Sequence, residues 1–266
     1  MLSPTKKAKM IESLKHYKKK YLDKVNDAEL DEASTRIFIN TFLSEVLGFS
    51  LIDEIKTEFM IRGTYADYMI QVDGHRHFLV EVKAYSLDLS EKHLRQTLNY
   101  GANEGIEYAL LTNGHSFELH KILFTQPINS CLIFAIELTD VPSLKKAAEL
   151  LQFIHKDSVL KGGLDTLWDK CEALNKYTVA GMLLSAEVIG TVKSLIKRKY
   201  SQRCSDEEVE KVISDIIGEE IDPTAIKVFK KVKPDRLKRP SKSETKILAG
   251  KDEIEEIHEV PPASEN

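Results

Sequence analysis

The sequence predicts an α/β fold, in which a mixed β-sheet flanked by helices is followed by a mainly helical C-terminal region. An apolar helical stripe precedes three strand-like segments, and a tight Asp73-Gly74 turn joins the second to the third. A helical segment then leads to another short apolar strand, and such a crossover joins parallel strands. After residue 140, apolar residues recur mainly at helical spacing.

Composition narrows the class of protein. The chain has 266 residues, 42% of them hydrophobic and 30% charged, which is typical of a globular protein with a substantial core. The net charge of -4 excludes a global basic field but not local basic patches. Three widely spaced cysteines without a CxxC pair indicate neither a thiolate zinc site nor a disulfide scaffold. With no apolar leader and no apolar run near ~20 residues, we expect a soluble cytoplasmic protein with no membrane partner.

Two helices are predicted at the start of the chain. Residues 5–25 are rich in lysine and carry apolar residues at helical spacing, which predicts a basic amphipathic helix. Its charged face is either simply solvated or in contact with phosphates. Residues 32–47 carry a stronger apolar stripe, and Gly48 stands where a helix end favours a left-handed residue.

Strands and one crossover helix are predicted next. The strand-like segments are residues 51–59, 64–72, 77–83, 108–112, 116–122 and 131–138. We expect a turn at Arg62-Gly63, a hairpin at Asp73-Gly74 and a type I′ hairpin at Asn113-Gly114. Residues 90–104 predict the helix that crosses from the third strand to the fourth.

The C-terminal part is predicted to be helical and then flexible. Helical spacing covers residues 141–155, 164–174 and 179–196, the last broken at Ser185, and a capping box at Ser205 opens a helix that ends at Gly218. A basic block at 230–242 and an acidic block at 251–266 show no periodicity, which favours a flexible tail. This tail is either solvated or bound to phosphate, to a partner or to its own domain.

The chain therefore divides into four parts. They are a basic N-terminal helix at 1–29, a sheet domain at 30–140, a helical region at 141–222 and a charged, flexible tail at 223–266.

Three charged residues lie on two adjacent apolar strands of the predicted sheet. Side chains alternate along a strand, so Glu81 and Lys83 share one face, and the hairpin register can bring Asp67 beside them. Paired carboxylates form a hard oxygen site suited to Mg²⁺ or Mn²⁺, which can polarise a phosphoryl oxygen and activate water. A nearby lysine can orient that water or neutralise the developing charge. The alternative is a cross-strand ion pair on a solvated sheet face.

The crossover helix supplies two more polar candidates. Gln96 and Tyr100 are one helical turn apart, and they lie roughly opposite the core-facing Leu94 and Leu98. They either support a metal or phosphate site or belong to an ordinary solvated helix face.

Five short motifs occur in a fixed order along the sheet domain. They are DEASTR at 31–36, ADY at 66–68, LVEVK at 79–83, QTLNY at 96–100 and ALLTNG at 109–114. Together they resemble the PD-(D/E)xK nuclease superfamily, and within it the N-terminal nuclease domain of type I restriction enzyme R subunits and their stand-alone relatives. The resemblance spans residues 30–125 and implies that the 30–140 domain is a nuclease with a restriction-endonuclease-like core.

The resemblance also implies roles for individual residues. Asp67 and Glu81 would be metal ligands for Mg²⁺ or Mn²⁺, with Lys83 orienting the attacking water. The accessory motif of this branch is matched by Gln96 and Tyr100, and its first-helix acid by Glu32 as a further metal ligand. Glu45 in the same helix is a substitute for Glu32. The family cuts phosphodiester bonds to leave 5′-phosphate and 3′-hydroxyl ends.

The leading hypothesis is a Mg²⁺-dependent nuclease that acts on DNA, in restriction or anti-phage defence, alone or with a protein partner or a second copy. No GxxxxGK[ST] motif is present, so we do not expect ATP-driven translocation. The first alternative is a catalytically silent nucleic-acid-binding or regulatory module on a nuclease scaffold. The second is a plain surface ion network on a protein whose helical half binds other proteins.

Overall fold

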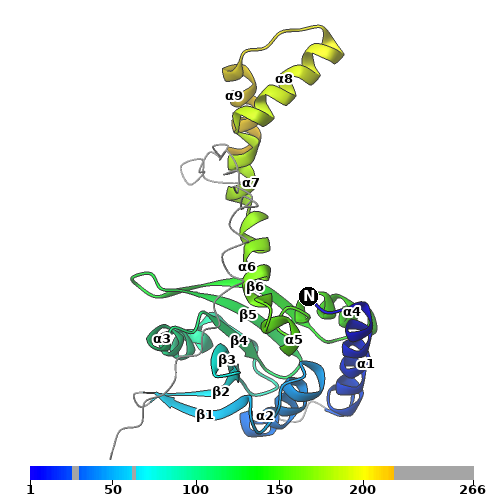
Figure 1. Cartoon of the computed structure of the whole chain (residues 1–266), viewed down its shortest axis with the longest axis vertical. Coiled ribbons are helices and arrows are strands. Elements are labelled where there is room, and N and C mark those ends of the chain that lie inside the picture. Colours follow the sequence, from blue (N-terminus) through cyan, green and yellow to red (C-terminus); the bar gives the residue numbers. More distant parts are fainter. Residues whose placement is uncertain (26–29, 62–63, 219–266) are drawn as a thin grey trace, which may run out of the picture.

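The structure of the chain, a computed structural model, describes residues 1–25, 30–61 and 64–218. In these ranges a six-stranded sheet carries helices on both faces, and a helical arm extends away from it (Figure 1). The predicted α/β class, with a mixed sheet and a helical C-terminal region, is confirmed. The turn expected at Arg62-Gly63 and the charged blocks at 230–242 and 251–266 lie outside the described residues.

The sheet has its strands in sequence order, from β1 to β6. Their bounds are β1 Ile55–Ile61, β2 Thr64–Val72, β3 His75–Val82, β4 Tyr108–Thr112, β5 Ser116–Leu123 and β6 Asn129–Glu137. Neighbouring strands are antiparallel except β3 and β4, which run parallel, as the predicted crossover helix requires. The strand predicted at residues 131–138 is confirmed as β6, which pairs with β5 at the edge of the sheet.

The two predicted hairpin turns have different conformations. Asp73 and Gly74 both have positive φ angles, of 49° and 79°, which is the pattern of a type I′ turn. At the second turn only Gly114 has a positive φ, 94°, so the type I′ prediction there is wrong. The Asn113 side chain closes a longer loop instead, because its Oδ1 accepts the Ser116 N–H at 2.9 Å.

The first strand begins later than predicted. Residues 51–54 form turns, and β1 begins at Ile55. Ser50 explains the difference, because its backbone N–H donates to the Glu54 carboxylate at 2.8 Å and its hydroxyl donates to Asp53 at 2.9 Å. These bonds satisfy local polar groups within the turn and favour it over a ladder.

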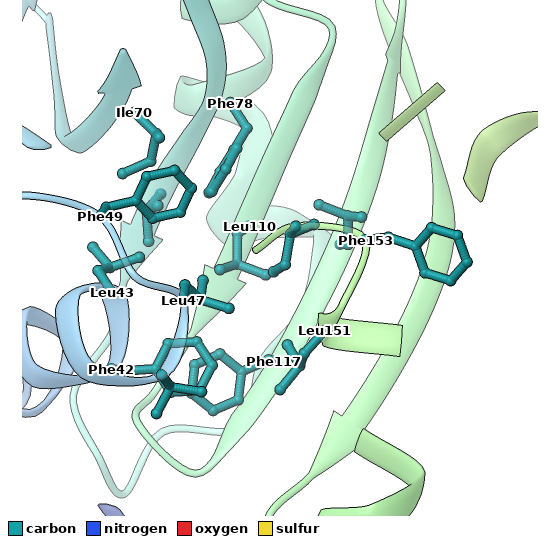
Figure 2. Packing of buried hydrophobic residues seen from close by; sticks show 14 of the residues in the cluster. Phe42, Leu43, Leu47, Phe49, Ile70, Phe78, Leu110, Phe117, Leu151 and Phe153 are labelled. Atoms are coloured by element: carbon teal, nitrogen blue, oxygen red, sulfur yellow. The ribbon is translucent and has the colours of Figure 1, made fainter. Parts of the chain in front are cut away.

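The N-terminal helices cover one face of the sheet. They are α1 Pro4–Lys20, the short 3₁₀ segment η1 Leu22–Lys24, α2 Glu32–Thr41 and a π-helical segment η2 Phe42–Val46 that continues α2. Phe42, Leu43 and Leu47 are fully buried and pack toward strand residues such as Phe78 and Phe117 (Figure 2). Helix α1 belongs to the same core, since Tyr17 is buried and donates its hydroxyl to the Gly114 carbonyl at 2.7 Å.

Helix α3 covers the other face. The predicted crossover helix begins as the 3₁₀ segment η3 Glu91–Leu94 and continues as α3 Arg95–Glu104, which ends at the left-handed Gly105. Gly101 lets α3 approach the sheet closely, because a Cβ there would clash with the side chain of Ile122 in β5. This close approach decides which α3 side chains face the strands.

Two of the C-terminal helices, α4 Val141–Leu151 and α5 Lys156–Val159, pack into the core of the sheet domain. The others form the arm (Figure 1), namely α6 Gly163–Ala173, α7 Lys176–Leu183, α8 Ala186–Tyr200 and α9 Asp206–Gly218. The predicted break falls between α7 and α8, where Ser185 caps α8, and the Ser205 capping box opens α9. Among the described helices, no single one is long and apolar enough to cross a membrane, and α7 with α8 meets that test only as a pair bent by 57°.

Candidate active site

The charged cluster predicted from the sequence assembles where β2 and β3 lie side by side near the start of α2. The antiparallel register pairs Tyr68 with Val80, so Asp67 and Glu81 are the next neighbours across the ladder. Both carboxylates are largely buried, with Asp67 9% and Glu81 6% exposed. This burial contradicts the alternative of an ion pair on a solvated sheet face.

Asp67 is held through both of its carboxylate oxygens. Its Oδ2 accepts the backbone N–H of Val82 at 2.7 Å, which ties the side chain to the neighbouring strand. Its Oδ1 forms an ion pair with the Arg36 guanidinium, which comes from the first turns of α2. Arg36 also donates to Glu32 at 3.0 Å, one helical turn earlier.

Glu81 is held in the same way by two partners. Its Oε1 lies 2.5 Å from the Lys83 Nζ, and its Oε2 accepts the hydroxyl of Thr97 at 2.9 Å. Thr97 is buried in α3, so the carboxylate is enclosed between the sheet and this helix. The Lys83 Nζ lies 3.6 Å from Glu32, which connects the two halves of the cluster.

Burial and charge determine the protonation of the cluster. Burial raises the pKa of Asp67, against the lowering effects of the Val82 hydrogen bond and Arg36. It also raises the pKa of Glu81, although the hydrogen bond from Lys83 acts in the opposite direction. Burial acts to lower the pKa of Lys83, but its hydrogen bond and charge interaction with Glu81 outweigh that effect and raise this pKa. Lys83 is therefore an ammonium that donates hydrogen bonds, not a base.

Of the two predicted acids in the first helix, one lies at the cluster and the other does not. Glu32 is at the edge of the cluster, with its side chain 40% exposed, and it contacts Arg36 and Lys83 rather than the two buried carboxylates. Glu45, the substitute for Glu32, is exposed in η2 and lines a separate cavity of about 580 Å³ between α1 and α5. It therefore does not replace Glu32 at the cluster.

The prediction for the faces of α3 is wrong for Tyr100. Its side chain is only 2% exposed and packs with Ala66, Met69, Leu79 and Ile106, not on a solvated face. The close approach at Gly101 brings this part of the helix onto the sheet, and burial raises the pKa of Tyr100 to about 12. Gln96 belongs to α3, but its side chain lies outside the described part of the structure.

Two residues at the cluster were missed from the sequence. Arg36 follows Glu32 by four positions, a spacing that predicts an ion pair within α2 but not its reach to Asp67. Thr97 follows the buried Leu94 by three positions, so the apolar spacing of α3 could have indicated that it faces the sheet. A hydroxyl on that stripe is a signal for a buried polar partner.

The donor set fits a hard divalent cation. Three carboxylates face two cationic side chains, so the cluster has one excess negative charge. Each oxygen of Asp67 and Glu81 keeps a second lone pair beyond the one contact described above, and Mg²⁺ or Mn²⁺ prefers such oxygens. Within the described ranges, no three His, Cys, Asp or Glu side chains converge to hold a metal. A cation would therefore use this carboxylate pair with phosphate, water or backbone oxygens.

The comparisons with known proteins agree with the sequence motifs. Residues 31–126 match the family model described as type I restriction enzyme R protein N terminus (HSDR_N). The resemblance to this family is therefore confirmed for the segment that contains Glu32, Arg36, Asp67, Glu81 and Lys83. No curated protein and no solved structure gives a significant match.

Proposed function

We propose, taking the match of residues 31–126 to type I restriction enzyme R proteins as the premise, that the chain is a Mg²⁺- or Mn²⁺-dependent nuclease that hydrolyses phosphodiester bonds in DNA. One observation carries the proposal: two buried carboxylates, Asp67 and Glu81, lie side by side with the Lys83 ammonium 2.5 Å from one of them. Buried carboxylates with raised pKa values, paired in this way, are characteristic of functional sites.

The residues of the cluster have distinct roles in this proposal. Asp67 and Glu81 would hold the cation, which when bound polarises the scissile phosphate and lowers the pKa of a bound water. The Lys83 Nζ is protonated and can donate hydrogen bonds to the attacking water or to a non-bridging phosphate oxygen. Thr97 and the Val82 N–H keep the carboxylates in place. Glu32, which contacts Arg36 and Lys83 in the structure, would turn toward the pair to be a third ligand, and Gln96 and Tyr100 would support the site from α3.

The family match supports a biological setting for this nuclease. Type I restriction enzymes act on DNA, so we propose restriction or anti-phage defence in the cytoplasm, with 5′-phosphate and 3′-hydroxyl ends as products. A protein partner or a second copy of the chain would supply targeting. The exposed lysines of α1, such as Lys9 and Lys19, are available to contact phosphates.

The test is a cleavage assay with the purified full chain. Wild type, Lys83→Ala and Asp67→Ala would be incubated with single-stranded DNA, duplex DNA and RNA in Mg²⁺, Mn²⁺ or EDTA. We expect metal-dependent cleavage of DNA by wild type and loss of at least about a hundredfold in both variants, because each removes a group at the reacting phosphate. Lys211→Ala, on the exposed surface of α9, is the matched control and should cleave like wild type. Cleavage that survives in both Asp67→Ala and Lys83→Ala contradicts the assignment.

A second candidate has its own supporting observation. Arg36 and Lys83 already neutralise most of the charge on Asp67 and Glu81, as a stable ion network would. On this alternative the chain is a catalytically silent nucleic-acid-binding or regulatory module. Its DNA affinity should fall steeply with salt, and no metal should induce cleavage. A binding titration at several salt concentrations, beside the cleavage assay, separates the two candidates.

A further inference from the structure

We infer that Arg36 is a positioning residue that closes the carboxylate site, and that a cation binds at Asp67 only when Arg36 withdraws toward Glu32. This inference rests on the proposed function, since it assigns the device that controls access to the same site. Nothing in the sequence motifs gave Arg36 a role. The role of Arg36 is inferred from its ion pair with Asp67 in the structure.

Arg36 occupies the oxygen of Asp67 that carries no backbone hydrogen bond. The Asp67 Oδ2 accepts the Val82 N–H at 2.7 Å, and this bond joins two adjacent strands. The remaining oxygen, Oδ1, is the one paired with Arg36. A guanidinium and a divalent cation repel each other at such a short distance, so the two compete for Oδ1.

Arg36 already has the partner that it needs after withdrawal. Its guanidinium donates to Glu32 Oε1 at 3.0 Å, so Glu32 can keep the charge compensated when Asp67 is released. A planar guanidinium presents five donors in a fixed fork and can bridge two carboxylates, whereas a lysine ammonium is a compact point charge on a flexible stem. Glu32 is thus the side chain that stabilises the open position.

The observed conformation of Arg36 leaves one of its donors unpaired. The Arg36 Nε is buried without a hydrogen-bond partner among the described groups, although the guanidinium reaches both carboxylates. Leaving a buried donor unsatisfied costs stability, and a different side-chain conformation could pair this donor. The Tyr68 hydroxyl donates to the Arg36 backbone carbonyl at 3.1 Å, which anchors α2 to β2 while the side chain moves.

The experiment measures Mn²⁺ binding to the full chain without DNA, by calorimetry and by the electron paramagnetic resonance of free Mn²⁺. The variants are Arg36→Gln, which removes the guanidinium charge, and Arg36→Lys, which keeps a positive charge beside the buried Asp67. Arg36→Lys serves as the second variant if Arg36→Gln folds poorly. Arg76→Gln is the matched control, because Arg76 pairs with Glu104 away from the cluster. Titrations are run at mildly alkaline pH, so that the carboxylates are ionised.

We expect Arg36→Gln to bind Mn²⁺ ~10-fold more tightly than wild type, a change of ~1.4 kcal/mol. Arg36→Lys should fall between the two, because a lysine keeps the positive charge but lacks the fixed fork of guanidinium donors. Arg76→Gln should bind like wild type, and Asp67→Asn should abolish binding in every background.

A double variant separates the role of Glu32 from that of a metal ligand. Glu32→Gln removes the open-state partner of Arg36 as well as a proposed ligand, so it should weaken Mn²⁺ binding more in the wild-type background than in the Arg36→Gln background. If Glu32 were only a metal ligand, its removal would weaken binding equally in both backgrounds, and the inference would be overturned.

The outcomes also separate this inference from the proposed function. Equal Mn²⁺ affinity in wild type, Arg36→Gln and Arg36→Lys overturns the closing role of Arg36 but leaves the metal site intact. Absence of Mn²⁺ binding in all variants overturns the metal site and the inference with it.

Discussion

Replacing Thr97 with valine tests whether α3 helps to hold the carboxylate cluster. Both side chains are β-branched and have nearly the same shape, so the substitution removes the hydroxyl without opening a cavity. In the folded protein this hydroxyl donates to Glu81 Oε2 at 2.9 Å, and Thr97 is 1% exposed, so water cannot replace it easily. A hydrogen bond to a charged group contributes ~1.5–3 kcal/mol, and we therefore expect Thr97→Val to lower the free energy of unfolding by ~2 kcal/mol.

The loss should depend on the charge of Glu81. The Thr97 hydroxyl lowers the pKa of Glu81 against the dominant effect of burial, so the hydrogen bond favours the ionised carboxylate. The difference in stability between wild type and Thr97→Val should therefore shrink as the pH falls through the raised pKa of Glu81 and the carboxyl becomes protonated.

The assay is urea unfolding of wild type, Thr97→Val, Glu81→Ala and the double variant at two pH values. A loss of ~2 kcal/mol corresponds to a decrease in melting temperature of ~4–8 °C for a domain of this size. Thr191→Val is the control, because the Thr191 hydroxyl donates to the Glu187 carbonyl at 2.8 Å on the exposed side of α8, and it should change stability by less than ~0.5 kcal/mol. Additive effects of Thr97→Val and Glu81→Ala, within ~0.5 kcal/mol, would show that the two groups do not interact and would refute the reasoning.

Three further predictions concern protonation and packing. Burial raises the pKa values of Asp67 and Glu81, so between the ordinary and the raised values the folded protein binds more protons than the unfolded chain. As the pH falls through that window, the free energy of unfolding should therefore increase while the affinity for Mn²⁺ decreases. A pH series of urea unfolding and calorimetry checks both trends. Gly101→Ala should destabilise the protein by ~2 kcal/mol or more, because its Cβ would lie 2.8 Å from the Ile106 carbonyl oxygen, and a melting temperature equal to wild type would contradict this close approach. Tyr17→Phe should lower the unfolding free energy by ~1–2 kcal/mol, since the buried hydroxyl donates at 2.7 Å to a carbonyl in the turn between β4 and β5, and urea unfolding measures the change.

Regular periodicity predicted the sheet domain well. Alternation along β3 placed Glu81 and Lys83 on one face, and the turn at Asp73-Gly74 paired β2 with β3. These two predictions succeeded because strand period and turn conformation are local properties of the sequence. The register that puts Asp67 beside Glu81 also depends on a one-residue shift between Ile70 and Gln71, which the turn does not specify.

Features that depend on the approach of whole elements were not predictable. Tyr100 was assigned to the solvated side of α3 because the helical period alone does not say how deeply a helix enters a sheet, and Gly101 sets that depth. The contact of Arg36 with Asp67 joins residues 31 positions apart, and no local pattern reports such a pairing. At Asn113 the side chain competes with the backbone for hydrogen bonds, which turned a predicted type I′ hairpin into a longer loop.

The π-helical segment η2 affects how the charged cluster is oriented, although it does not contact that cluster. Inside it the Leu47 N–H donates to the Phe42 carbonyl, five residues back, so this turn holds one residue more than a continuous α-helix would. Each residue of an α-helix advances the rotation by ~100°, and the extra residue therefore resets the angular phase of the helix by about that amount. The two ends of this helical stretch are thus oriented independently. The polar start in α2 carries Glu32 and Arg36, and the apolar end after η2 carries Leu47. A deletion of one residue in η2 would merge the two phases and turn Arg36 away from Asp67, so the alignment of the charged cluster depends on the length of a segment outside it.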